Sequence, residues 1–305
     1  MPHCGAMADS ESVDRSGAEK HGADPHVCVT CAAHYAEDTP LPAVCTICTD
    51  ERQYVGADGQ QWTRHSELKA AHEMRFSEYE PGLWGVGLKP GLGIFQRALL
   101  VRTEAGNVLW DCVPVLTDEG YQRLVELGGV QAVAVSHPHF YSGMALYAEA
   151  FGANVYVHAA DRQHVTHPHP RLRFWENERF SPLPGVTLIR GGGHFAGGTV
   201  LHWPAGAGGK GALLTADIIG VVPDRRYVSF LYSFPNRIPL PPREVERVGA
   251  AVEPFEFDRI YGGWEGNVIA NDAKEVVRRS VLRYRRAVEA RLDGATLPWP
   301  EPSTT

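Results

Sequence analysis

Two histidines of this sequence stand two residues apart, directly after a short apolar run. His137 and His139 follow the run 131–135, which predicts a buried strand. Active sites of α/β sheets lie at the carboxyl edge of their strands, so we expect both imidazoles at such an edge. Histidines at this spacing on an extended turn point the same way, and the rigid ring of Pro138 limits the rotation that would separate them. The pair is therefore suited to bind one metal ion.

Two later segments offer the further ligands that a pair of histidines needs. His194 lies in a glycine-rich stretch after a predicted strand at 186–190, and Asp217 follows a predicted strand at 212–216 in the same way. Three strand ends thus deliver three imidazoles and one carboxylate. This donor set suits Zn²⁺ or Fe²⁺ with a coordination position left open.

Four cysteines form a second candidate metal site. Cys28 and Cys31 make one Cys-x-x-Cys pair, and Cys45 and Cys48 make another after thirteen intervening residues. Two tight turns of this kind aim four thiolates inward at a tetrahedral Zn²⁺ ion, whereas a redox dithiol needs one pair on a βα turn. A module of about thirty residues has almost no core, so the metal would supply its folding free energy. We expect a structural zinc ion in a zinc-ribbon-like module at residues 26–50.

The composition indicates a folded chain and leaves small or neutral partners open. Of its 305 residues, 44% are hydrophobic and 21% charged, and the formal net charge is −7. This balance argues against broad contact with nucleic acid. No run approaches the roughly 18 apolar residues that span a membrane, and the N-terminus has no apolar stretch of signal-peptide type. We expect a cytoplasmic protein with a small-molecule substrate and no nucleic-acid or membrane partner; the sequence leaves its oligomeric state open.

Composition and periodicity divide the chain into four segments. Residues 1–25 are rich in small and charged residues and predict a disordered tail, and residues 296–305 predict a flexible one. Between the cysteine module and the second tail, strands alternate with helices in a domain at 57–295. Strands are expected at 95–102, 108–112, 131–135, 154–158, 186–190, 199–203, 212–216 and 258–262, and helices at 117–128, 142–151, 159–165, 242–252 and 271–292.

The order of these motifs resembles that of the metallo-β-lactamase superfamily between about residues 80 and 265. The likeness rests on four segments, each at the end of a predicted strand: Leu109-Trp110-Asp111, His137-Pro138-His139, the loop of His194, and Leu214-Thr215-Ala216-Asp217. The resemblance implies an α+β fold, the four-layer αβ/βα sandwich, with the zinc-ribbon-like module as an N-terminal appendage. It also implies that the three histidines and Asp217 bind the first metal of the family.

The sequence departs from the family pattern at the second metal. The family motif His-x-His-x-Asp-His has Tyr141 and Ser142 here in place of its last two ligands, and Trp264 stands where the family has a later histidine. A dinuclear site lacks its usual ligands. The resemblance therefore implies a hydrolase with one active-site ion, Zn²⁺ or Fe²⁺, which acts on a small ester, thioester, lactone or amide.

Several roles stay open at this stage. Asp217 either ligates the metal or takes the proton from the attacking water, and Tyr141 either donates a hydrogen bond to an oxyanion or packs in the emptied second-metal pocket. For Trp264 the packing role is favoured. The alternatives to a zinc hydrolase are a non-hydrolytic protein that binds a ligand or partner on the same fold, and an iron-dependent enzyme with the same ligands.

Overall fold

The computed structural model describes residues 24–289. The tails predicted at 1–25 and 296–305 lie outside this range, apart from Asp24 and Pro25. Within the described residues, no helix is long and apolar enough to cross a membrane.

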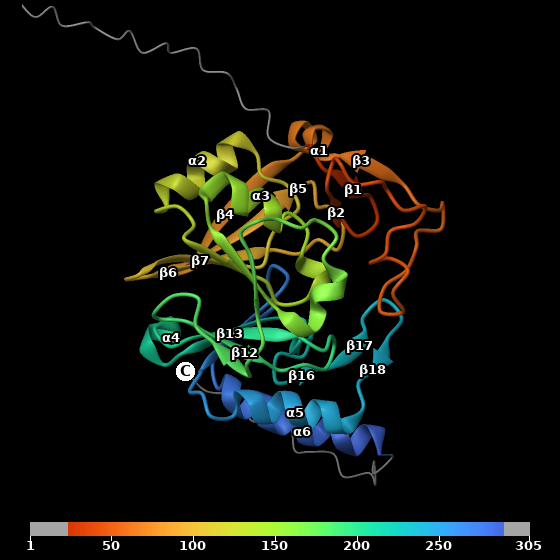
Figure 1. Ribbon diagram of the computed structural model, residues 1–305. Coiled ribbons are helices and arrows are strands. Elements are labelled where there is room, and N and C mark those ends of the chain that lie inside the picture. Colours follow the sequence, from red (N-terminus) through yellow and green to blue (C-terminus); the bar gives the residue numbers. More distant parts are fainter. Residues whose placement is uncertain (1–23, 290–305) are drawn as a thin grey trace, which may run out of the picture.

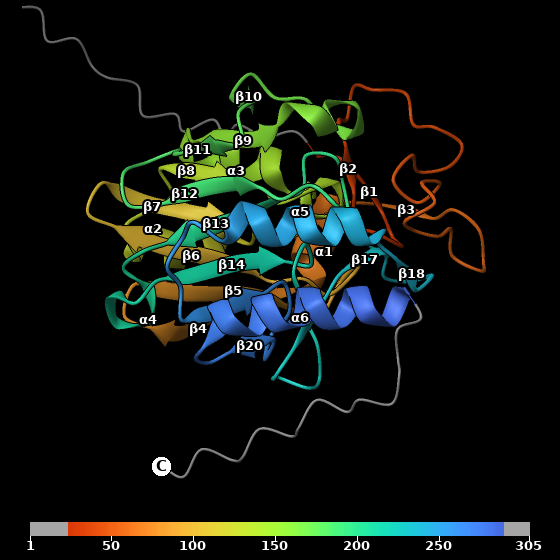
Figure 2. The ribbon, with the colours of Figure 1, turned by 90° about the horizontal axis from the view of Figure 1, so that it is seen from below.

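The main domain consists of two facing sheets with helices on both outer sides (Figure 1). Helices α2 (Asp118–Glu126) and α3 (Met144–Phe151) cover one sheet, and α5 (Pro242–Val252) and α6 (Ala273–Val288) cover the other. Figure 2 shows the last two helices side by side across the second sheet. This arrangement is the four-layer αβ/βα sandwich, and it confirms the predicted fold class.

The first sheet has seven strands, and its order changes from antiparallel to parallel where the candidate ligands begin. The strands predicted at 95–102 and 108–112 are present and pair antiparallel as a hairpin, and the strand that precedes His137 pairs parallel with the second of them. In spatial order the strands are β10 (Leu172–Trp175), β9 (Asn154–His158), β8 (Ala132–Ala134), β7 (Gly106–Trp110), β6 (Ala98–Thr103), β5 (Leu83–Lys89) and β4 (Glu73–Glu80).

The second sheet has six strands, of which β14 and β19 are parallel neighbours and the other pairs are antiparallel. Its order is β11 (Arg179–Phe180), β12 (Thr187–Arg190), β13 (Thr199–Trp203), β14 (Ala212–Ala216), β19 (Arg259–Gly262) and β20 (Val268–Ile269). Shorter elements are β15 (Gly220–Val221), β16 (Val228–Ser229), β17 (Leu231–Ser233), β18 (Ile238–Pro239), α4 (Gly206–Gly209) and the 3₁₀ segments η1 (Pro138–Phe140) and η2 (Ala159–His164).

Strand β6 shows why the apolar runs of this sequence are continuous rather than alternating. Its residues Leu99 and Val101 belong to the core between the two sheets, while Ala98 and Leu100 belong to the core under α2 and α3. Successive side chains of a strand point to opposite faces, and both faces of this strand are covered. A third core lies between the second sheet and α5 and α6.

The four-cysteine module is a small three-stranded sheet packed on the side of the sandwich. Its strands β2 (His34–Tyr35), β1 (His26–Cys28) and β3 (Trp62–Arg64) are antiparallel, and α1 (His65–Ala71) follows. The sheet therefore continues past the predicted boundary at residue 50. Its residues Val27 and Ala32 form a cluster with Val115 of the sandwich.

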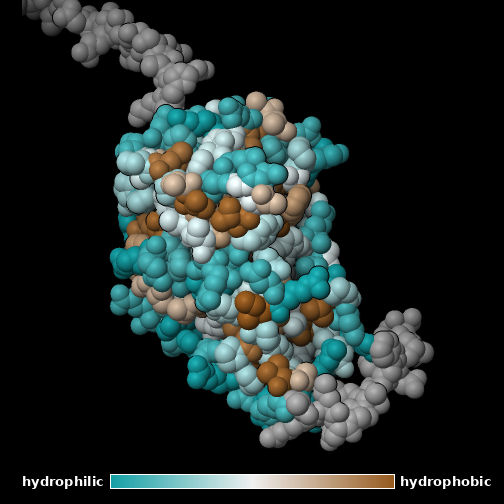
Figure 3. Space-filling model, turned by 90° about the vertical axis from the view of Figure 1, so that its right-hand side faces the viewer, coloured by the Kyte–Doolittle hydropathy of each residue, from teal (hydrophilic) through white to brown (hydrophobic). Residues whose placement is uncertain are grey.

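On the face that carries the module, the described residues form no single large apolar surface. Figure 3 views this side of the molecule and shows hydrophobic residues in separate patches among hydrophilic ones. The module's exposed valines are Val29, Val44 and Val55. Single exposed apolar residues are ordinary on soluble surfaces and need no special explanation.

Candidate active site and metal centres

The structure brings the three candidate histidines and Asp217 together at one edge of the sandwich. His137 and His139 follow β8, His194 follows β12, and Asp217 follows β14. All four side chains are buried, the most exposed being His139 at 6%. One ligand atom from each residue lies within 4.8 Å of the ligand atoms of the others. The strand ends thus converge as the sequence predicted.

Tight backbone geometry aims His194 and Asp217 into this centre. The N–H groups of Gly191 and Gly192 both donate to the carbonyl oxygen of Gly198, which closes the His194 loop. A Cβ on Gly198 would lie 2.6 Å from the Gly192 oxygen, so this closure requires glycine. Before Asp217, Ala216 has a φ of 48°, in the left-handed region that is unfavourable for alanine. Strained residues of this kind cluster at functional sites.

The donor atoms at the centre fit a cation. Among the described residues, His137 Nε2 and Asp217 Oδ1 are buried without a hydrogen-bond partner, although they lie 3.2 Å apart. His194 Nδ1 lies 2.7 Å from the carbonyl oxygen of Tyr232. The proton must therefore be on Nδ1, and Nε2 presents its lone pair to the centre.

The spacing of the donors also matches a small metal ion. His194 Nε2 lies 3.2 Å from His139 Nδ1. Ligands at about 2.0–2.2 Å from a tetrahedral Zn²⁺ ion are roughly 3.3 Å apart. The nitrogen and oxygen lone pairs that converge here repel one another unless a cation or protons lie between them, so the residues present fit a bound metal.

Burial keeps the imidazoles in the neutral form that binds metal. It lowers the pKa of His137 and His139 well below the usual value, and it lowers that of His194 to about 4. Burial also raises the pKa of Asp217 to about 8, with a further contribution from the charge of Asp111. A bound cation would reverse the rise at Asp217 because it stabilises the carboxylate.

Asp111, at the end of β7, supports the turn that carries the first two histidines. Its Oδ1 accepts a hydrogen bond of 2.8 Å from the N–H of Ser136, and burial raises the pKa of this carboxyl to about 7. The hydroxyl of Ser136 in turn lies 2.9 Å from His137 Nδ1. The side chain of Asp111 thus contacts the backbone of the turn that carries His137 and His139.

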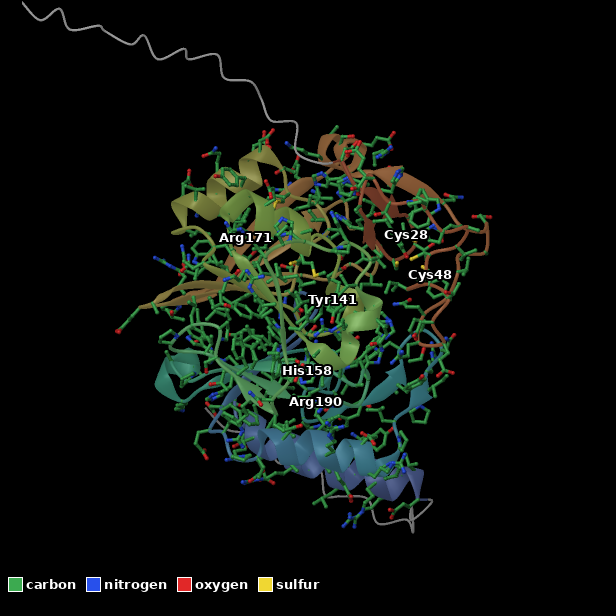
Figure 4. The ribbon with its side chains drawn as sticks, in the orientation of Figure 1. Cys28, Cys48, Tyr141, His158, Arg171 and Arg190 are labelled. Atoms are coloured by element: carbon green, nitrogen blue, oxygen red, sulfur yellow. The ribbon has the colours of Figure 1, made fainter. Side chains whose placement is uncertain are left out.

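The residues at the second-metal positions of the family are engaged in other contacts. Ser142 Oγ accepts a hydrogen bond from Gln96 Nε2 at 3.1 Å, and Trp264 Nε1 donates to the Ile94 carbonyl oxygen at 2.7 Å. Tyr141 is buried in the core under α2 and α3, and its label lies near the middle of the molecule in Figure 4. This environment favours the packing role for Tyr141; its role as an oxyanion donor stays a prediction.

Arg52 is a residue at this site that the sequence did not single out. Its Nη1 donates to the carbonyl oxygen of His194 at 3.3 Å, and its guanidinium carbon lies 3.8 Å from the centre of the Phe195 ring. Asp161 makes a comparable contact from η2, because its Oδ1 accepts from the N–H of Gly197 at 2.8 Å. Neither contact has a sequence signal, since both join segments that are far apart in the chain.

The four cysteines lie together, and their sulfur atoms have the spacing of a zinc site. The Sγ atoms of Cys28 and Cys48 are 3.6 Å apart, and those of Cys31 and Cys45 are 3.7 Å apart. Four sulfurs at about 2.3 Å from one tetrahedral ion are separated by roughly 3.8 Å. Figure 4 shows Cys28 and Cys48 beside each other in the module.

The surroundings of the sulfurs are also those of a metal-thiolate site. Gln60 Nε2 donates to Cys28 Sγ at 3.3 Å, and the Tyr35 hydroxyl donates to Cys45 Sγ at 3.4 Å. Hydrogen bonding to Cys28 and burial hold the pKa of the Cys31 thiol above its usual value. A cation would offset this rise, so the set fits a bound ion.

Comparisons with known proteins agree with this geometry. A family model described as the metallo-beta-lactamase superfamily matches residues 92–229. "Uncharacterized protein YmaE" of Bacillus subtilis (strain 168) is 43% identical over 269 residues, which are 88% of this chain and 98% of that protein.

Solved structures are similar in fold at low sequence identity. VMB-1 is 13% identical with a TM-score of 0.52, and the alignment covers 71% of this chain and 98% of that one. A motif mutant of a metallo-β-lactamase from Cronobacter sakazakii is 19% identical with a TM-score of 0.48 over 73% of this chain and 98% of that one. At these identities the likeness to VMB-1 concerns the fold alone.

Proposed function

The chain belongs to the metallo-β-lactamase superfamily, and on that premise we propose that it is a metal-dependent hydrolase with one active-site ion. The observation that carries the proposal is the convergence of three histidine side chains and one aspartate, all buried, within 4.8 Å. A single ion is favoured because Tyr141, Ser142 and Trp264 replace the family's second-metal ligands. The substrate class that we propose is a small ester, thioester, lactone or amide.

The chemistry that the metal supplies when bound is Lewis acidity, which polarises a carbonyl oxygen and lowers the pKa of water. His137, His139, His194 and Asp217 would hold it. The Tyr232 carbonyl orients the His194 ring through Nδ1, and the Ser136 hydroxyl lies at Nδ1 of His137. Such outer contacts fix the direction in which each ring presents its lone pair.

Asp217 is the group we propose for proton transfer. Its two oxygens face different histidines, with Oδ1 3.2 Å from His137 Nε2 and Oδ2 3.9 Å from His194 Nε2. One oxygen can ligate the ion while the other accepts a proton from the attacking water. When water adds to the carbonyl carbon and the bond to the leaving group breaks, the proton held by Asp217 passes to that group.

The side chains around the ligands favour a small substrate with apolar parts. The rings of Phe195 and Phe234 lie 5.0 and 5.6 Å from that of His194, and the Trp264 ring lies 6.5 Å from that of Phe234. Aromatic side chains beside a metal centre suit an apolar ligand. The same side chains would also suit the alternative, a protein that binds such a ligand without hydrolysing it.

For the other centre we propose one structural Zn²⁺ ion held by Cys28, Cys31, Cys45 and Cys48. Four thiolates leave no coordination position for a substrate. The donor types also separate the two centres, since thiolates select zinc over iron more strongly than imidazole and carboxylate do.

Hydrolysis assays test the proposed activity. Zinc-loaded and iron-loaded protein is assayed against activated esters, thioesters and lactones, beside a His137→Ala variant. We expect turnover by the wild type with a basic limb near neutral pH, and its loss in the variant. A metal-loaded wild type that is inert on the whole panel would contradict the enzyme and favour the binding protein.

A further inference from the structure

A short segment of the four-cysteine module reaches the active site directly after the last cysteine. In this segment, Asp50–Gln53, the guanidinium of Arg52 forms a two-pronged ion pair with Asp50, with Nε–Oδ1 and Nη2–Oδ2 distances of 2.6 Å. Both side chains are only 15% exposed. A fork of this kind holds the guanidinium in one orientation. Its third nitrogen, Nη1, is directed at the His194 carbonyl oxygen.

A second set of contacts joins the same segment to β17 and to the turn that follows it. Ser233 Oγ donates to the Arg52 carbonyl oxygen at 3.1 Å, and the Tyr232 hydroxyl donates to Glu51. Asn236 Nδ2 donates to the carbonyl oxygens of Glu51 and Gln53, both at 3.2 Å. In Figures 1 and 2 the module loop and the β17–β18 hairpin lie on the same side of the molecule.

His194 is therefore contacted from this segment in two ways. Arg52 contacts its backbone carbonyl directly. Tyr232, which is held by the segment through its hydroxyl, accepts the hydrogen bond from Nδ1 of the His194 ring. A ligand that is fixed at both its backbone and its ring presents its lone pair in a defined direction.

The segment itself depends on the cysteine turn for its position. The N–H of Asp50 donates to the Ile47 carbonyl oxygen at 3.3 Å, and the N–H of Thr49 donates to that of Cys45 at 3.1 Å. The core around the four cysteines is small, so a bound ion would supply much of the order of this turn.

We infer that Asp50 and Arg52 are a positioning pair that makes metal affinity at the histidine site depend on metal at the cysteine site. The inference rests on the proposed function only in so far as the histidine site binds a metal; it does not require hydrolysis. Coupling between two sites is reciprocal, so the ion at either site strengthens binding at the other.

The positive charge of Arg52 should weaken cation binding at the histidine site, whereas its positioning role should strengthen it. The sign of the change in metal affinity on removal of Arg52 therefore tests the inference. A guanidinium close to the three histidines opposes a bound cation, and Asp50 offsets only part of this effect. If charge dominated, removal of Arg52 would tighten metal binding at the histidine site. If positioning dominates, its removal weakens binding. If Arg52 served only to hold an anionic substrate, KM would rise while metal affinity stayed the same.

The experiment measures Co²⁺ and Zn²⁺ binding to the full chain by competition with a chelator. Thiolate-to-cobalt charge-transfer absorption reports Co²⁺ at the cysteine site; when that site is filled with Zn²⁺, which has no d–d bands, the d–d bands of added Co²⁺ report the histidine site. Arg52→Gln and Asp50→Asn should each lower affinity at the histidine site about 10- to 100-fold and change its d–d bands, because contacts behind a ligand have effects of this size. Arg52→Lys, which keeps the charge but not the fork, should recover little of the lost affinity.

Arg64→Gln is the matched control within the module. Arg64 Nη1 donates to the Asp24 carbonyl oxygen, away from His194, so its replacement should leave the histidine site unchanged. Cys28→Ser should lower affinity at the histidine site by a factor similar to that of Arg52→Gln, and the double variant should bind no more weakly than the weaker single one, since both changes break the same path.

Unchanged or tighter binding by Arg52→Gln, with the cysteine site loaded, would overturn the inference, as would a wild type whose histidine site takes up no Co²⁺. If the wild type hydrolyses nothing but the histidine site of Arg52→Gln binds metal more weakly than that of the wild type, the coupling is supported while the proposed hydrolase fails. The two failures are thereby distinguished.

Discussion

The two candidate metal centres of this chain are built in opposite ways. The four cysteines come from two neighbouring turns and belong to a small core. The histidine site draws its ligands from three strand ends, between His137 and Asp217, and lies against cores on both faces of the first sheet. The cysteine centre would thus need its ion to hold the turns together, whereas the sandwich brings the histidine ligands together before any ion arrives and the module segment completes the orientation of His194.

This difference indicates what a bound ion would contribute to the stability of each centre. An ion that closes a module with so small a core would contribute folding free energy. An ion that enters a preorganised site mainly relieves the repulsion of buried donors and changes their pKa values. Removal of both ions should therefore affect the two regions very differently, and the predictions below test this contrast in order of expected size.

Chelation of all metal should disorder the module and leave the sandwich folded. Structural zinc contributes an apparent 10–16 kcal/mol in small zinc modules, so amides of β1 and β3 should lose their hydrogen-exchange protection. Those of β6 and β13 should keep it. Loss of protection in β6 together with β1 would mean that the two regions unfold as one unit.

Asp217→Asn should lower kcat by about 10²–10⁴-fold if this carboxylate takes the proton from water. The amide keeps the shape of the side chain but cannot accept the proton. Steady-state kinetics on metal-saturated protein measures the effect, with metal content determined on the same sample. Full activity with full metal would remove the proton-transfer role of Asp217.

In metal-free protein, the sandwich should become less stable as pH rises. The folded-state pKa of Asp217 is raised to about 8 and that of Asp111 to about 7, against about 3.9 in an unfolded chain. The folded state binds more protons, so stability is highest below about pH 4 for these two groups and is lost as pH rises towards 8. Thermal unfolding in the presence of chelator, measured at several values between about pH 5 and 8, tests this loss of stability. Saturating zinc should remove the trend, and its persistence would argue against an ion at Asp217.

The docking of the module on the sandwich should show the opposite pH dependence, with stability lost as pH falls. His34 is buried beside His65 and His167, with ring centroids 6.0 and 6.5 Å away, and burial lowers its pKa well below the usual value. The charged form is disfavoured in the folded chain, so stability is lost as pH falls below about 6.5.

Hydrogen exchange of β1–β3 at decreasing pH measures this effect, and His34→Phe should move the midpoint to lower pH. Zinc release by protonated thiols occurs in both proteins, so the difference between them isolates His34. Identical midpoints would show that this histidine does not control docking.

The smallest effect is expected at Tyr141. Tyr141→Phe keeps the ring in the core and removes only the hydroxyl, so kcat should fall less than for Asp217→Asn. A fall on the order of 10²-fold or more would restore the oxyanion role that its burial disfavours.

The sequence predicted best those elements in which local pattern and final environment agree. Strand β8 and the two histidines after it follow from an apolar run that ends in a turn, and β13 and β14 are mostly apolar, with every residue buried. The sandwich itself was expected from the resemblance of motif order, and the structure confirms it.

The hairpin of β4 and β5 was missed, although polar and apolar residues alternate at the start of β4 as in a half-buried strand. Strand β4 carries charged residues on its exposed positions, and β5 contains Gly85 and Gly87, which are unfavourable in strands. The reason for Gly85 appears only in three dimensions: a Cβ there would lie 2.3 Å from the ring of Tyr79.

The contact of Arg52 with His194 was also beyond prediction. The two residues are 142 positions apart, and a charged pair next to a cysteine motif has no periodicity that would indicate its partner. Only the docking of the module on the sandwich brings them together.

Metal content measured by elemental analysis tests the central claim most directly, on protein purified without added metal and then saturated with zinc. The account predicts one ion in each centre of the wild type, loss of the histidine-bound ion in His194→Ala, and loss of the cysteine-bound ion in Cys28→Ser. At saturation the second variant should retain its histidine-bound ion despite the weaker affinity. A wild type with only the cysteine-bound ion, unchanged by His194→Ala, would contradict the account.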